Sequence, residues 1–140
     1  MQNVLVLCTG NSCRSQIAHG FLEKLSEGRA HIYSAGIETH GVNPRAIKVM
    51  DEDRIDIAHH TSNNLSEYKN IDFDFVITVC DNANEHCPVY LSSNSKLKRF
   101  HHNFPDPAKA TGSEEDIMRE FRKVREMIRI YCKDFVKDYL

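Results

Sequence analysis

The sequence predicts an α/β domain with a parallel sheet, because short apolar runs that suit buried strands alternate with segments in which apolar residues follow helical spacing. The chain has 140 residues, so we expect a single domain over residues 1–140. Hydrophobic residues make up 41% and charged residues 27%, as in ordinary globular proteins. The formal net charge of -2 argues against a nucleic-acid-binding protein that relies on bulk positive charge.

Two strands and a helix are expected at the start of the chain. Residues 3–8 are almost continuously apolar, which is typical of a strand buried on both faces. Apolar residues recur at helical spacing from Ser15, and Gly28 is a suitable stop. Residues 31–35 predict a second strand, ending at Gly36. In such folds ligands bind outside the carboxyl ends of the strands, where strand order reverses, so the loop after the first strand is the favoured site.

The middle of the chain predicts a helix and two further strands. Asn43 suits an N-cap and Pro44 the first helical position of a helix that runs to about residue 54. Residues 73–80, apolar and rich in β-branched side chains, predict a third strand, and residues 97–102 a weaker fourth. Three apolar residues are expected on the buried face of the helix: Ala46, Ile47 and Met50.

The last element is expected to be a long helix capped by Ser113, with Glu114, Glu115 and Asp116 near its positive end. Its apolar residues recur at helical spacing and predict one buried stripe. The stripe contains Ile117, Phe121, Val124, Ile128, Tyr131, Phe135 and Tyr139.

Composition also narrows the role of the five cysteines. No apolar stretch approaches the roughly 20 residues of a membrane span. The apolar run at residues 4–8 is too short for a signal peptide. We therefore expect a cytosolic protein without a membrane association, in which thiols stay reduced. The cysteines then indicate catalysis, redox chemistry or metal binding rather than a disulfide framework.

The strongest motif is Cys-x5-Arg-Ser, formed by Cys8, Arg14 and Ser15, with on the order of 0.02 chance matches expected at this composition. A short loop before a helix can aim backbone N–H groups at one oxyanion, and the helix adds its positive end. Arg14 can hold two oxygens of the anion, and the same field lowers the pKa of a cysteine and prepares it as a nucleophile. Ser15 is expected to donate a hydrogen bond to the Cys8 thiolate. The residues predicted to bind the oxyanion are Thr9, Gly10, Asn11, Ser12, Cys13 and Arg14.

This loop resembles the active-site loop of the low-molecular-weight protein tyrosine phosphatase superfamily. Within that superfamily the chain is similar to thioredoxin-coupled arsenate reductases, and residues 34–44 resemble their second-strand segment. The resemblance covers essentially the whole chain. It implies a four-stranded parallel sheet flanked by helices, arsenate as substrate and thioredoxin as external reductant. We expect a monomer with no tightly bound cofactor and no metal.

Asp106 is the candidate general acid. An Asp-Pro dipeptide, here Asp106-Pro107, is by itself common turn chemistry. Oxyanion transfer nevertheless needs a proton donor for the departing oxygen, and a carboxyl on a restricted loop suits that task. The resemblance implies that Asp106 is this acid, although Pro105 stands where related reductases often have a second aspartate.

Cys80 and Cys87 follow the third predicted strand, and Cys80 is expected on the same side of the sheet as Cys8. Reduction of arsenate requires two electrons, so one thiol can hold the arsenic, a second can displace it as a disulfide, and a third can resolve that disulfide. Two alternatives remain: a metal site that adds His86 and either His101 or His102, and two unrelated cysteines. The spacing lacks the close pairing usual for zinc. The resemblance favours redox-active Cys8, Cys80 and Cys87.

The remaining motifs receive plainer interpretations. Cys13 and Cys132 are expected to be packing residues. Some related reductases bind potassium through carboxylates near the loop, but His19 and Asn63 stand at the matching positions, which argues against that site here.

Two rival functions remain open from the sequence. A tyrosine phosphatase would use Cys8, Arg14 and Asp106 equally well. Against it, residues 108–110 lack the paired tyrosines of those phosphatases, and Gln16 replaces their usual proline. The non-enzyme rival is a module that binds metalloid or oxyanion without turnover.

Overall fold

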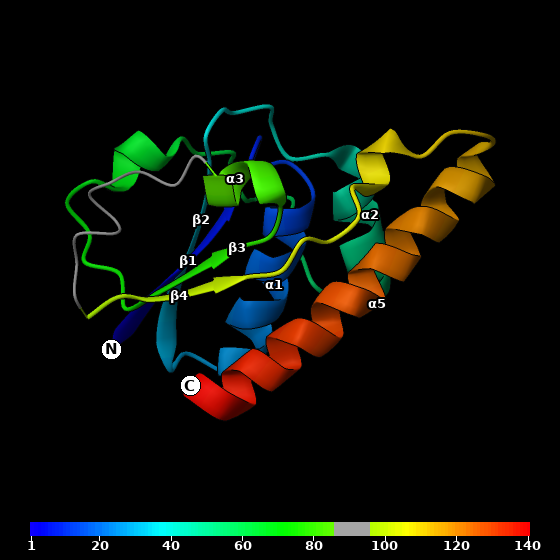
Figure 1. The fold of residues 1–140 in the computed structure, drawn as a ribbon. Helices are drawn as coiled ribbons and strands as arrows, with labels where there is room; N and C mark the ends of the chain where they lie inside the picture. Colours follow the sequence, from blue (N-terminus) through cyan, green and yellow to red (C-terminus); the bar gives the residue numbers. More distant parts are fainter. Residues whose placement is uncertain (86–95) are drawn as a thin grey trace.

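The computed structural model describes residues 1–85 and 96–140 and contains one four-stranded sheet in which every pairing is parallel. The strand order is β2-β1-β3-β4 (Figure 1). The strands are β1 (Gln2–Cys8), β2 (Ala30–Gly36), β3 (Phe75–Thr78) and β4 (Lys98–His101). The chain therefore moves from β1 to one side for β2 and crosses to the other side for β3, which makes the carboxyl ends of β1 and β3 the switch point of the sheet.

Burial follows the position of each strand in the sheet. The two central strands are covered on both faces: the last five residues of β1 and all of β3 are buried. The edge strand β4 has no fully buried residue, which explains why its sequence signal is weak. The regular part of β3 is shorter than the predicted 73–80. Asp74 still bonds to Asn3 and Val79 to Leu7, so the extended chain continues past both ends of the ladder.

Three helices are packed together beside the sheet: α1 (Arg14–Ser26), α2 (Pro44–Glu52) and α5 (Glu114–Tyr139). Helix α1 contacts β1 and β2, and α5 runs beside α1 and α2 (Figure 1). Both predicted caps are confirmed, because the side chain of Asn43 accepts from Arg45 and that of Ser113 from Asp116. Among the described residues, no helix has the length and apolarity needed to cross a membrane.

The buried face of α5 differs in part from the predicted stripe. Tyr139 is exposed, and Ile117 and Tyr131 are only partly buried. Tyr139 instead lies against Phe100 and Phe135 at the end of the helix. The face that packs inward is shifted by about one residue at several positions, because α5 packs mainly on α1 and α2, while its Phe135 contacts Phe75 and Phe100 of the sheet. Its buried residues are Met118, Phe121, Val124, Ile128, Cys132, Phe135 and Val136.

Three short elements have no counterpart in the sequence prediction: η1 (Leu65–Tyr68), α3 (Asp81–Glu85) and η2 (Pro107–Lys109). None is long enough to show a hydrophobic period. The most consequential is α3, which begins directly after Cys80 and contacts both β1 and β3. It therefore fixes the position of Cys80 at the switch point.

Candidate active site

The loop between β1 and α1 is held from outside through its carbonyl groups. Backbone N–H groups of residues 37–43 donate to the carbonyls of Cys8, Thr9, Gly10 and Ser12 over 2.8 to 3.3 Å. Because these carbonyls are turned toward a neighbouring segment, the N–H groups of the loop are left for the opposite side, where an anion can be bound.

Asn11 braces the same loop from inside. It is fully buried and adopts a left-handed conformation with φ 49°, which asparagine tolerates better than most residues. Its Oδ1 accepts from Ser15 Oγ at 2.8 Å and from Gln16 Nε2 at 3.0 Å, and its Nδ2 donates to Ser34 O. The prediction that Ser15 donates to Cys8 is therefore wrong: its single hydroxyl proton is donated to Asn11.

Gly36 leaves no room for a side chain beneath the loop. A Cβ built there would lie 2.7 Å from Thr9 O, 2.8 Å from Asn11 N and 2.3 Å from Glu38 O, all of them backbone atoms. We expect Gly36→Ala to lower the free energy of unfolding by about 1–3 kcal/mol and to weaken the binding of phosphate or arsenate, because the loop must shift. Urea unfolding and anion titration measure the two effects.

Gly28→Ala is the control for the steric effect: Gly28 has a positive φ of +78°, which Gly36 does not have, and nothing lies within 4 Å of its built Cβ. We expect this variant to lose about 1–2 kcal/mol from backbone strain alone while its anion affinity stays unchanged. Normal anion affinity in Gly36→Ala would contradict the role given to this contact.

A pocket opens over the loop at the carboxyl end of β1. Arg14 and Asp106 stand together in its wall, with Nη2 of the arginine 3.7 Å from Oδ2 of the aspartate. Nη1 of Arg14 donates to Phe104 O at 2.9 Å, and Oδ1 of Asp106 accepts from Ala108 N at 3.0 Å. The pocket is lined by Cys8, Thr9, Gly10, Ser12, Cys13, Arg14, His40, Asp106 and Ala108. The structure thus brings the predicted nucleophile, arginine and acid into one cavity.

Cys80 lies beside Cys8, and both thiols are buried and free. The two thiols interact, and Thr9 Oγ1 lies 3.3 Å from Cys80 Sγ. The interaction with Cys8, together with those with Thr9 and Ala83, lowers the pKa of Cys80 to about 5. The interaction with Cys80 and burial raise the pKa of Cys8.

The pair of thiols therefore holds one proton and one negative charge at neutral pH, and its titration belongs to both sulfurs together. Arg14 favours the charged form of either thiol. The expectation that Cys80 would lie on the same side of the sheet as Cys8 is confirmed. Cys87 and His86 lie outside the described residues.

The alternative metal site gains no support from His101. Its Nε2 lies 2.7 Å from Asp81 Oδ1 and its Nδ1 lies 2.7 Å from Thr78 Oγ1, so both ring nitrogens already have partners. His102 stacks on Phe104 and Tyr131.

The two remaining cysteines differ in their surroundings. Cys132 is a packing residue, as predicted: it is 1% exposed and its thiol faces Ala18 O. Cys13 is also buried but lines the anion pocket, and burial raises its pKa to about 12. Such a thiol stays protonated at neutral pH and is a poor nucleophile.

Sequence reasoning missed two residues of the pocket. His40 stands at its rim, with Nε2 2.6 Å from Glu38 Oε2, and Ala108 forms part of its wall. No motif marks either of them. Both reach the pocket through loops that fold back toward β1, and their side chains have no spacing relation to Cys8.

The fold and the loop define a class of α/β protein that binds a tetrahedral oxyanion between a cysteine and an arginine at the switch point of a parallel sheet. The sequence profile of the low molecular weight phosphotyrosine protein phosphatase family matches residues 3–139. The chain belongs to this family.

Several similar proteins are named for a different activity, the reduction of arsenate. The chain is 45% identical over 134 residues to an arsenate reductase of Oceanobacillus iheyensis, covering 96% of this chain and 94% of that one. It is 41% identical over 139 residues to an arsenate reductase of Bacillus subtilis, covering 98% of each. A solved structure described as an arsenate reductase in the phosphate-binding state matches all of both chains, with a TM-score of 0.84 and 28% identity.

Proposed function

We propose that this protein reduces arsenate to arsenite through Cys8, Cys80 and Cys87, with thioredoxin as the external reductant. The observation that carries the proposal is a pair of buried, interacting thiols, with Cys8 in the wall of the anion pocket and Cys80 beside it. A phosphatase needs the first thiol only, whereas a two-electron reduction needs both. The names of the similar proteins support the same reaction.

In the first step the Cys8 thiolate attacks the arsenic atom of arsenate bound by the loop and Arg14. The proton that Cys8 holds in the resting pair passes to Cys80 as Cys8 reacts. An As–S bond forms and one As–O bond breaks, and Asp106 donates the proton with which that oxygen leaves as water.

In the second step Cys80 gives its proton to an oxygen of the bound arsenic as its sulfur attacks the sulfur of Cys8. An S–S bond forms and the As–S bond breaks with its electron pair remaining on arsenic, so As(V) becomes As(III) and arsenite leaves. Cys87 then attacks Cys80, which releases the Cys8 thiolate and leaves a Cys80–Cys87 disulfide. A thioredoxin dithiol takes that disulfide back to two thiols, and the two electrons balance.

Turnover of arsenate with thioredoxin, thioredoxin reductase and NADPH tests the proposal. We expect one NADPH to be consumed for each arsenite formed. A protein that hydrolyses aryl phosphates but consumes no NADPH would be a phosphatase. Tightly bound metal or oxyanion after purification, with no turnover of either kind, would indicate the binding module.

The phosphatase alternative finds less support in the pocket wall. The loop after Asp106 contributes Ala108, and the lining formed by described residues contains no tyrosine or phenylalanine to hold an aromatic phosphate ester. We therefore place any phosphatase chemistry at Cys8 as a weak side activity.

We expect Asp106→Asn to slow the first arsenite released in a single turnover by about 10²–10⁴-fold. The substitution removes the transferable proton but keeps an oxygen that can accept from Ala108 N. Oxyanion affinity should therefore change little. Titration with phosphate, an oxyanion that is not reduced, measures this affinity. An unchanged single-turnover rate would show that the proton comes from another group.

A further inference from the structure

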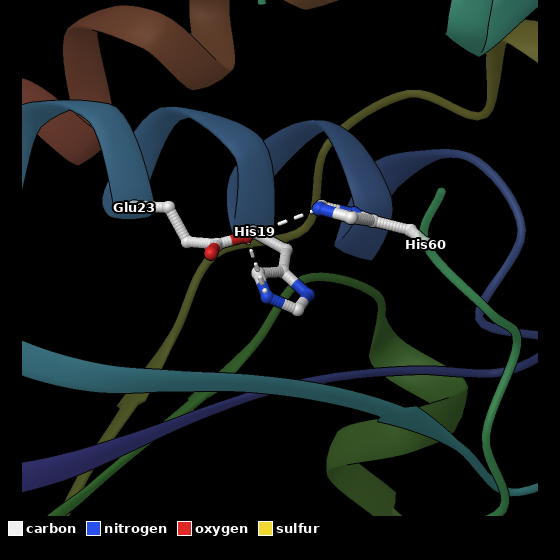
Figure 2. Close-up of side chains that lie close together, drawn as sticks. All are labelled: His19, Glu23 and His60. Carbon is white, nitrogen blue, oxygen red and sulfur yellow. Dashed lines mark ion pairs between the residues drawn. The ribbon is translucent and has the colours of Figure 1, made fainter. Parts of the chain in front are cut away.

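A second cluster of titratable side chains lies on the far side of Gln16 from the anion loop. His19 and Glu23 are one turn apart on α1, and His60 comes from the loop after α2. One ligand atom from each of the three lies within 4.8 Å of the others. Figure 2 shows both imidazole rings directed at the Glu23 carboxylate, and Nε2 of each ring is 3.0 Å from the same oxygen, Oε1.

The proton positions of His60 are fixed by Gln16. Nε2 of Gln16 donates to Asn11 O, Asn11 Oδ1 and Thr61 O, so the orientation of the amide is settled. Oε1 of Gln16 can then only accept, and it lies 3.0 Å from Nδ1 of His60. Nδ1 of His60 therefore carries a proton, and Nε2 is directed at Oε1 of Glu23.

The ligand atoms converge on one point that is partly shielded from solvent. The side chain of His60 is only 6% exposed, and the ring centroid of His19 is 4.3 Å away. Nε2 of each ring already lies 3.0 Å from Oε1 of Glu23, so a cation bound at this point would replace the two contacts that now join the rings to the carboxylate.

We propose that Nε2 of His19, Nε2 of His60 and a carboxylate oxygen of Glu23 bind a divalent transition-metal ion, with Zn²⁺ as the expected occupant. Two imidazoles and one carboxylate are a common zinc donor set. Mg²⁺ and Ca²⁺ prefer oxygen ligands throughout. The open fourth position faces solvent, because Glu23 is half exposed and borders a surface hollow that His59 and His60 also line.

The hydrogen bonds made by the other nitrogen of each imidazole hold the rings in place for metal binding. Nδ1 of His19 lies 2.7 Å from Ser34 Oγ, and Nδ1 of His60 donates to Gln16, so each ligand ring is oriented through its other nitrogen. Gln16 also bonds to Asn11, which braces the anion loop. Metal binding would therefore stabilise the fold around the loop without placing the ion in the anion pocket.

Titration of metal-free protein with Zn²⁺ by calorimetry, and with Co²⁺ by visible absorption, tests the proposal. Because the thiols of the proposed redox cascade also bind zinc, the parent protein for these titrations is the triple variant Cys8→Ser, Cys80→Ser, Cys87→Ser. We expect one equivalent to bind, a rise in Tm, and a Co²⁺ spectrum without thiolate charge transfer. Absence of stoichiometric binding, or a thiolate spectrum from the remaining cysteines, would overturn the proposal.

Three single substitutions locate the site. Glu23→Gln and His19→Gln should each weaken Zn²⁺ binding by at least about 10-fold and remove the rise in Tm. His59→Gln is the matched control: this exposed neighbour lies outside the ligand set, and the variant should bind as the parent does. If the parent variant folds poorly, Glu23→Gln can be made in the protein that keeps all its cysteines. That variant should bind one equivalent of Zn²⁺ less than the protein without the substitution. Binding as tight as the parent's in Glu23→Gln would refute the site.

Discussion

Cys8→Ser is expected to lose arsenate reduction by at least about 10⁴-fold and any phosphatase chemistry with it. A serine hydroxyl does not ionise at neutral pH, so neither the pair of thiols nor the arsenic adduct can form. The coupled NADPH assay and an aryl phosphate assay measure the two losses. Cys132→Ala is the control, since this buried thiol lies on α5, away from the pocket.

Arg14→Lys is expected to fail almost as badly. The guanidinium is held between Phe104 O and Asp106, and an ammonium cannot make both contacts and still offer a planar fork to two oxygens. Near-normal turnover in either Cys8→Ser or Arg14→Lys would refute the assignment of the loop.

Cys80→Ser and Cys87→Ser are both expected to stop cycling with thioredoxin, but at different points. Without Cys87 the enzyme should release one arsenite and stop as a Cys8–Cys80 disulfide, because these two thiols are close enough to shift each other's pKa. That disulfide would be buried, since both residues are under 5% exposed, and therefore hard for thioredoxin to reach.

Without Cys80 even the first arsenite should be slow to appear, because the adduct on Cys8 has no thiol beside it. Cys13 also lines the pocket, but its raised pKa of about 12 keeps it protonated. Rapid-quench measurement of arsenite per enzyme distinguishes the two variants: about one equivalent for Cys87→Ser and far less for Cys80→Ser. Both variants should retain weak phosphatase chemistry at Cys8. Sustained cycling in both would contradict the division of labour among the cysteines.

Local signals account for the parts of the fold that the sequence predicted well. The cap at Asn43, the cap at Ser113 and the apolar run of β1 each depend on a few neighbouring residues, and all three are confirmed. Helix α3 could not be predicted in this way, because only Ala83 of its described side chains is buried. Its stability comes from contacts with β1 and β3 that are distant in sequence.

The candidate site divides in the same way. The spacing of Cys8 and Arg14 predicted an anion loop, since that loop is one continuous segment. The partner of Ser15 was predicted wrongly, because the buried left-handed Asn11 takes its proton, and nothing in the motif indicates that conformation. The contact of His60 with His19 and Glu23 crosses from a loop to a helix, so it appears only once the fold is known.

The most direct test of the central claim is to identify the disulfide that accumulates when the reduced protein is mixed with arsenate in the absence of thioredoxin. Alkylation, proteolysis and mass mapping of the unmodified chain give the answer. We expect a Cys80–Cys87 disulfide, one arsenite per protein, and a Cys8 that is free to be alkylated. A disulfide that joins any other pair as the accumulated product, or a protein that remains fully reduced while arsenate is bound, would contradict it.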